Sequence, residues 1–153
     1  MKRFLASGFG VGLVWQNIFG NKKGGGTLAP LIFMVLVYFL NLNVLELSIV
    51  FLSLLLIYFY SVKDYYADED PSWITLDEIV GMSLVSLASP SEMLPLIAGF
   101  LVFRASDILK QPKFVSNLED YPGKLGVLYD DLGAGLLGLL SATIVYQVSL
   151  LTL

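Results

Sequence analysis

Five apolar segments, joined by short polar links, constrain the fold of this chain more than any other feature. Hydrophobic residues make up 56% of the 153 residues and charged residues only 14%. A soluble domain is usually about 45–50% apolar and about 25% charged. The excess apolar surface has no place in one soluble core of this size. We therefore expect an all-α polytopic membrane protein, a single domain over residues 1–153, with about five transmembrane or membrane-embedded helices.

The first 60 residues predict a surface element followed by two spans. Residues 1–20 are semi-apolar and interrupted by glycines, which predicts a short N-terminal interfacial or re-entrant helix. Leu28 to Leu42 predicts the first span and Val44 to Tyr60 the second, with Asn41 and Asn43 flanking a tight turn. Both spans are somewhat short, because about 20 residues are needed to cross the ~30 Å hydrocarbon core.

The middle of the chain allows two topologies. Residues 79–103 could form one long span with a break, or two antiparallel helices. Thr75 followed three residues later by Glu78 is typical of a capping box, which predicts a helix from Thr75 to about Ala88. A further helix is then expected from about Glu92 to Lys110.

The distribution of charge favours two helices. If the segments alternate in direction, all nine basic residues fall on one face of the membrane, and the opposite face keeps only Glu46 and Glu92. Lys and Arg are retained on the cytoplasmic side, so we expect that face, with the N-terminus, to be cytoplasmic. The nine residues are Lys2, Arg3, Lys22, Lys23, Lys63, Arg104, Lys110, Lys113 and Lys124.

The C-terminal part predicts a polar loop and one long helix. Residues 111–129 are expected to form the loop, and Asp130 and Asp131 to open the last helix. Small residues recur every fourth position in that helix, a pattern typical of close helix packing. The stripe would serve either as a homo-oligomer seam or for packing within the monomer. It consists of Ala134, Gly138 and Ala142.

The composition also limits the chemistry. The chain has no Cys and no His, so any catalysis must use carboxylates, Lys, Arg, hydroxyl groups or a hard metal ion. The net charge of −4 and the absence of a basic stripe argue against nucleic acid as a partner.

The predicted helix ends bring five carboxylates and two cations to one interface. Taken singly, each acid is explained by the helix dipole or by a surface ion pair. Taken together, five repelling carboxylates persist most easily around divalent cations, and oxygen-only ligands suit Mg²⁺. Arg104 and Lys110 could then hold a phosphate, which suggests phosphoryl chemistry on a lipid head group. The carboxylates are Asp77, Glu78, Asp107, Asp130 and Asp131.

Several motifs resemble those of the phosphatidylglycerophosphatase A family, in the family's order and over most of the chain. Residues 70–82 (DPSWITLDEIVGM) resemble its DPxxIVxDExxGM signature, and residues 103–110 (FRASDILK) its FRxxDxxKP segment. Residues 123–135 (GKLGVLYDDLGAG) resemble its GxxGIMxDDxxAG segment. Residues 8–12 (GFGVG) are similar to its GFGxG, and Gly26-Thr27 to the GT of its APGTxGSL segment.

The resemblance implies a Mg²⁺-dependent, multi-pass phosphatase of the bacterial inner membrane that converts phosphatidylglycerophosphate to phosphatidylglycerol, with its active site on the cytoplasmic side. On the matching positions it implies Arg104, Lys110 and Thr27 as substrate-binding residues. All five carboxylates become candidate metal ligands, and four of them candidate catalytic groups. Those four are Asp77, Glu78, Asp107 and Asp131.

Two other classes remain as alternatives. A small cation transporter or channel subunit would usually carry its intramembrane acids in mid-span, whereas these acids lie at helix ends. A non-catalytic assembly protein that shares the fold would insert normally but hydrolyse nothing.

Overall fold

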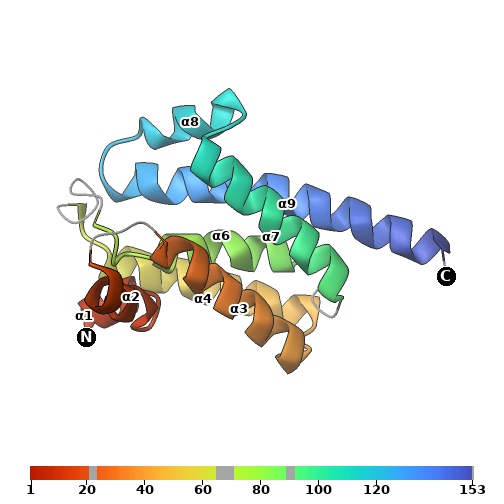
Figure 1. Cartoon of the computed structure of the whole chain (residues 1–153), viewed down its shortest axis with the longest axis horizontal. Coiled ribbons are helices and arrows are strands. Elements are labelled where there is room, and N and C mark those ends of the chain that lie inside the picture. The colour runs from red at the N-terminus through yellow and green to blue at the C-terminus, as the bar shows by residue number, and fades with distance from the viewer. Residues whose placement is uncertain (21–23, 65–70, 89–91, 153) are drawn as a thin grey trace.

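The computed structural model describes residues 1–20, 24–64, 71–88 and 92–152, and these residues form eight helices without a β-strand (Figure 1). The expected all-α class is therefore confirmed. The helices are α1 (Lys2–Ala6), α2 (Val11–Phe19), α3 (Gly25–Leu40), α4 (Val44–Ser61), α6 (Leu76–Ser86), α7 (Met93–Leu109), α8 (Lys113–Glu119) and α9 (Lys124–Thr152).

Helix α6 is the centre of the fold. It packs against α3 and α4 on one side and against α7 and α9 on the other (Figure 1). Nine of its 11 residues are buried, as expected for a helix that is surrounded by other helices. The first turns of α6 thereby lie beside α9 around Asp131.

The two-helix alternative for the middle of the chain is confirmed. Helices α6 and α7 run in opposite directions and are joined at the end of the bundle that also holds the link between α3 and α4 (Figure 1). The N-termini of α3, α6 and α9 and the C-termini of α4 and α7 gather at the other end, which we call the active end (Figure 1). Of the nine basic residues, Lys22 and Lys23 lie outside the described residues.

Two of the described helices, α4 and α9, are long and apolar enough to cross a membrane, and α3 is a shorter apolar helix. Large apolar side chains on both long helices are exposed, among them Leu45, Leu56 and Ile144, which are 71%, 71% and 64% exposed. Lipid is the solvent that such surfaces fit. The other described helices are shorter than a typical span.

Two expected boundaries are wrong. Residues 1–20 form two short helices rather than one, because Gly8, Phe9 and Gly10 adopt positive φ angles that end α1. The expected polar loop over residues 111–129 contains α8, and α9 begins at Lys124 rather than at Asp130.

The early start of α9 has a tertiary cause. The carboxylate of Asp64 accepts a hydrogen bond from the Lys124 backbone N–H at 3.3 Å. The Tyr58 hydroxyl donates to the Lys124 carbonyl oxygen at 2.7 Å. The C-terminal end of α4 and the residues just after it thus hold the first turn of α9, through contacts that span 60 and 66 residues of sequence.

The stripe of small residues packs within the chain. Ala134 and Ala142 are fully buried, and a Cβ added to Gly138 would lie 2.7 Å from the Gly99 carbonyl oxygen on α7. The intramolecular alternative is therefore confirmed. These residues are not available as an oligomer seam, because α7 already covers them.

Candidate active site

Three of the predicted carboxylates converge at the active end. Asp77 and Glu78 come from the first turn of α6, and Asp131 from the second turn of α9. Each offers an oxygen atom, and these atoms all lie within 4.8 Å of one another. Asp77 and Asp131 are each only 4% exposed. We call these three residues the carboxylate triad.

The triad has unused hydrogen-bonding capacity. Asp77 Oδ1, Glu78 Oε2 and Asp131 Oδ1 are buried and have no hydrogen-bond partner in the part of the chain that the structure describes. A buried polar oxygen without a partner is costly, and buried charges are normally paired or coordinated to a metal. The triad therefore fits a cation.

The predicted capping box at the start of α6 is wrong. Thr75 is the residue before the helix, but its side chain makes no capping hydrogen bond. Its backbone N–H donates instead to the carbonyl oxygen of Ala6 at 3.2 Å. Because α1 already satisfies that N–H, the Glu78 carboxylate is free to join the triad.

Burial changes the acidity of the α6 carboxyl groups. Desolvation raises the pKa of Asp77 above its ordinary value. It raises the pKa of Glu78 well above the ordinary value, and the neighbouring charge of Asp77 raises it further, while Arg104 acts in the opposite direction. A divalent cation would relieve both the burial of charge and the repulsion.

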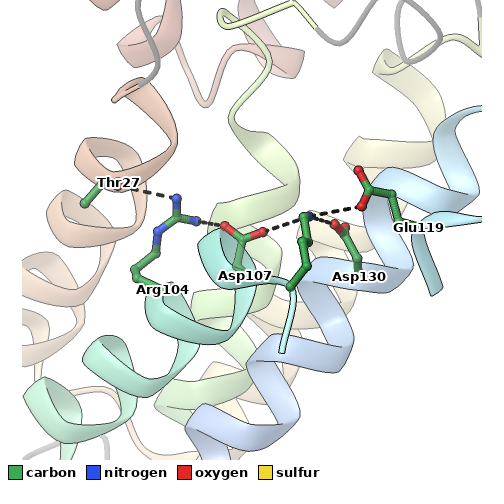
Figure 2. A network of polar contacts seen from close by, with 6 residues as sticks. Thr27, Arg104, Asp107, Glu119 and Asp130 are labelled. Atoms are coloured by element: carbon green, nitrogen blue, oxygen red, sulfur yellow. Dashed lines mark hydrogen bonds and ion pairs between the residues drawn. The ribbon is translucent and has the colours of Figure 1, made fainter. Parts of the chain in front are cut away.

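The other predicted residues form a chain of polar contacts that begins at Thr27 and continues through alternating charges to Asp130 (Figure 2). Arg104 Nη2 donates to Thr27 Oγ1 at 3.4 Å, and Arg104 Nη1 lies 2.6 Å from Asp107 Oδ2. The ammonium group of Lys110 lies 3.3 Å from Asp107 Oδ1 and also contacts Asp130 Oδ2. We call these five residues the ion-pair chain.

The ion-pair chain is partly buried rather than superficial. The predicted arrangement of Arg104, Asp107 and Lys110 on one helix face is confirmed, but Arg104 is only 8% exposed. Burial alone would lower the pKa of Lys110, yet its hydrogen bond and ion pair with Asp130 outweigh burial and raise it. Lys110 is thus a fully charged member of the site.

The start of α3 packs directly against both groups. A Cβ added to Gly26 would overlap the Glu78 carboxylate and lie 3.6 Å from Arg104 Nη2. The first N–H groups of a helix attract anions, so this helix end favours a phosphate next to Thr27 and Arg104.

Sequence reasoning missed two members of this site. Gly26 was noted only as part of a motif, although a run of glycines before a helix is a signal that backbone approaches something closely. Glu119 on α8 lies 3.9 Å from the Lys110 ammonium group, and no local pattern pointed to it.

The donor set indicates which ion and which ligand the site would take. Three carboxylates without His or Cys form a hard oxygen site, the kind that suits Mg²⁺, Ca²⁺ or Mn²⁺. The adjacent guanidinium group, hydroxyl group and helix N-terminus suit an anion such as a phosphate. The structure therefore brings a candidate cation site and a candidate anion site together.

Comparison with known proteins gives two matches. Residues 4–146 match the family model described as phosphatidylglycerophosphatase A. The chain is also 31% identical over 142 residues to a Bacteroides thetaiotaomicron protein named "Putative phosphatidylinositol-3-phosphatase", a match that covers 86% of this chain and 84% of that relative. No solved structure matches.

Proposed function

The chain belongs to the phosphatidylglycerophosphatase A family of lipid phosphomonoesterases, and we propose that it hydrolyses phosphatidylglycerophosphate to phosphatidylglycerol and phosphate with Mg²⁺ as cofactor. The observation that carries this proposal is the convergence of the carboxylate triad from α6 and α9 next to Arg104 and Thr27.

The carboxylate triad would hold the Mg²⁺ ion. When bound, such an ion offsets the charge of the phosphoryl oxygens and of the leaving group. The buried, unpartnered oxygens of Asp77, Glu78 and Asp131 support this assignment. Oxygen ligands without imidazole or thiolate favour Mg²⁺ over softer metals.

Arg104 and Thr27 would bind the phosphoryl group. Arg104 uses Nη1 for Asp107, while Nε has no hydrogen-bond partner among the described residues and Nη2 makes only a long bond to Thr27. A guanidinium group held on one side in this way presents its remaining donors in a fixed orientation. Asp107 would therefore act by orienting Arg104, and the first turn of α3 would add backbone N–H groups.

Lys110 contributes in a different way from the one the motif suggested. The sequence pointed to a phosphate ligand, whereas the ammonium group contacts Asp107, Asp130 and Glu119. We therefore assign the phosphate to Arg104 and Thr27, and a supporting role to Lys110.

The active end would face the cytoplasmic lipid head groups of a bacterial inner membrane, with α4 and α9 crossing the bilayer. The support is the segregation of charge. Lys63 follows α4 and Lys124 opens α9 at the active end, whereas Glu46 and Glu92 lie at the other end. The lipid tails would stay in the bilayer, so that the site grips the head group alone.

A second candidate substrate is a phosphorylated phosphatidylinositol. The name of the Bacteroides thetaiotaomicron relative favours it. Both lipids present a phosphomonoester at the membrane surface, and the triad and Arg104 would treat this group alike. Substrate choice would then depend on what surrounds the alcohol part of the head group.

Phosphate release from the purified full chain in detergent tests the proposal. We expect Mg²⁺-dependent release from phosphatidylglycerophosphate, and loss of release in excess chelator. Parallel assays on phosphatidylinositol 3-phosphate distinguish the two lipids. Full activity in chelator would overturn the metal role, and no release from either lipid would overturn the proposed reaction.

A further inference from the structure

The five carboxylates at the active end have two different environments. Asp107 and Asp130 both contact the ammonium group of Lys110, and Asp107 also contacts Arg104. Arg104 and Lys110 thus pair with Asp107 and Asp130, and Lys110 also lies 3.9 Å from the exposed carboxylate of Glu119. Among the described residues, no ion pair reaches the carboxylate triad, and one buried oxygen of each triad residue lacks a hydrogen-bond partner.

The position of the Lys110 ammonium group is informative. It lies between two carboxylates, and Asp130 directly precedes the triad residue Asp131 on α9. Phosphatases with two metal ions hold them about 3.5–4 Å apart. The Lys110 ammonium group fills the space between Asp107 and Asp130, two carboxylates that could otherwise share a second cation.

The backbone holds Lys110 in that place. It ends α7 in a left-handed conformation, with φ of 50°. A residue with a side chain adopts this region at a cost, so the surrounding contacts must favour it. Those contacts are the ion pairs with Asp107, Asp130 and Glu119.

We propose that the site binds a single divalent cation on the carboxylate triad, and that the Lys110 ammonium group occupies the second cation position between Asp107 and Asp130. This inference rests on the proposed function, since it takes the triad as the Mg²⁺ site. Lys110 is then a positioning residue, and Asp130 is not a metal ligand although its neighbour Asp131 is.

The adjacent pair on α9 offers a matched test. Asp130 and Asp131 are both 4% exposed, and Asn has nearly the same shape as Asp. We would titrate Mn²⁺ into the full chain in detergent and follow binding by calorimetry and electron paramagnetic resonance. The wild type and Asp130→Asn should each bind one magnetically isolated Mn²⁺ per chain. Asp131→Asn should weaken binding by about 10- to 100-fold or more.

Removing the lysine tests its role directly. Lys110→Met leaves Asp107 and Asp130 facing each other without the ammonium group, and we expect a second Mn²⁺ to bind and give an exchange-coupled spectrum. Lys113→Met, on the exposed surface of α8, is the control and should still bind one ion. If Lys110→Met does not fold, the Asp130 and Asp131 variants decide the question alone.

Each result has one meaning. Two coupled Mn²⁺ ions in the wild type, loss of the ion in Asp130→Asn, or a single ion in folded Lys110→Met would overturn the inference. Those results would leave Mg²⁺-dependent hydrolysis intact. A wild-type chain that binds no Mn²⁺ and hydrolyses lipid in chelator would instead overturn the metal role in the proposed function.

Discussion

The N-termini of α4 and α6 carry similar sequences and use them differently. In α4, Asn43 Oδ1 accepts the Glu46 N–H at 3.0 Å, and the Glu46 carboxylate accepts the Asn43 N–H at 2.9 Å. Both residues are exposed. In α6, Thr75 and Glu78 have the same spacing, yet no reciprocal bonds form, and Glu78 Oε2 is buried without a partner.

The acid at the start of α4 stabilises its own helix, whereas the acid at the start of α6 is available to a ligand. The carboxylate of Glu46 is occupied by its own helix end. At α6 the corresponding N–H already bonds to Ala6, so the Glu78 carboxylate turns to Asp77 and Asp131. A helix-start acid is therefore a candidate ligand when the fold satisfies its capping position from elsewhere.

The largest expected effect comes from replacing one acid at the start of α6 and comparing the result with replacement of one acid at the start of α4. Asp77→Asn should lower kcat/KM for lipid phosphate release about 1000-fold, ~4 kcal/mol of transition-state stabilisation, because the triad would lose a ligand of the proposed Mg²⁺ ion. Glu46→Gln should leave the rate unchanged, since Glu46 lies at the opposite end of the bundle. Equal losses in the two variants would contradict the distinction.

A smaller effect is expected from a single methyl group at the start of α3. Gly26→Ala places a Cβ against the Glu78 carboxylate. Displacing that carboxylate by about 1 Å should cost roughly 100-fold in kcat/KM. The neighbouring Gly25→Ala is the control, because its Cβ would come no closer than 3.3 Å to Ser72, Trp15 or Thr75. The measured Mn²⁺ affinity should fall for Gly26→Ala and stay unchanged for Gly25→Ala.

The pH dependence of stability should report the buried acids of α6. Burial raises the pKa of Asp77 and Glu78 above their ordinary values of 3.8 and 4.5. The folded, metal-free chain then holds more protons than the unfolded chain. The free energy of unfolding of this metal-free chain is therefore highest below the ordinary pKa values. It falls as the pH rises through the raised pKa values.

Thermal unfolding in detergent checks this expectation. Without metal, Tm should fall as the pH rises above the ordinary pKa values of these carboxyl groups, and added Mg²⁺ should reduce the fall because the ion replaces the protons. The Asp77→Asn variant should show a weaker pH dependence. A Tm that rises with pH in the metal-free chain would contradict the inference that burial raises the pKa of Asp77 and Glu78.

The smallest effect should come from the helix end that serves structure alone. Asn43→Ala removes the side-chain acceptor for the Glu46 N–H. Such a loss typically costs about 1 kcal/mol of stability. Hydrolysis per folded molecule should not change. Unfolding in denaturant measures the loss of stability, and phosphate release measures the rate of hydrolysis.

Much of the site could be predicted from the sequence. The order of motifs and the helix-end positions indicated Asp77, Glu78, Asp131 and Arg104, and the structure brings these four to one end of the bundle. The trio around Asp107 followed from helical spacing, because residues three apart share a face. These positions agree with the structure since they follow from the order of the motifs, from helical periodicity and from the direction of each helix.

Other features could not be predicted locally. The capping box expected at α6 is absent because Ala6, about 70 residues earlier, accepts the Thr75 N–H. Helix α9 begins before Asp130 because Asp64 caps Lys124. Both outcomes depend on contacts between distant segments, and a local signal cannot say which partner will satisfy a backbone group.

Composition and helical period are properties of each segment alone, and they were enough to indicate a helical chain that is rich in apolar surface and acidic at one end. The division of the five predicted carboxylates between a candidate cation site and a set of ion pairs could be seen only in the folded chain. That division depends on where α7 ends, where α9 begins and how closely the two helices pack, and these distances exist only when the segments meet.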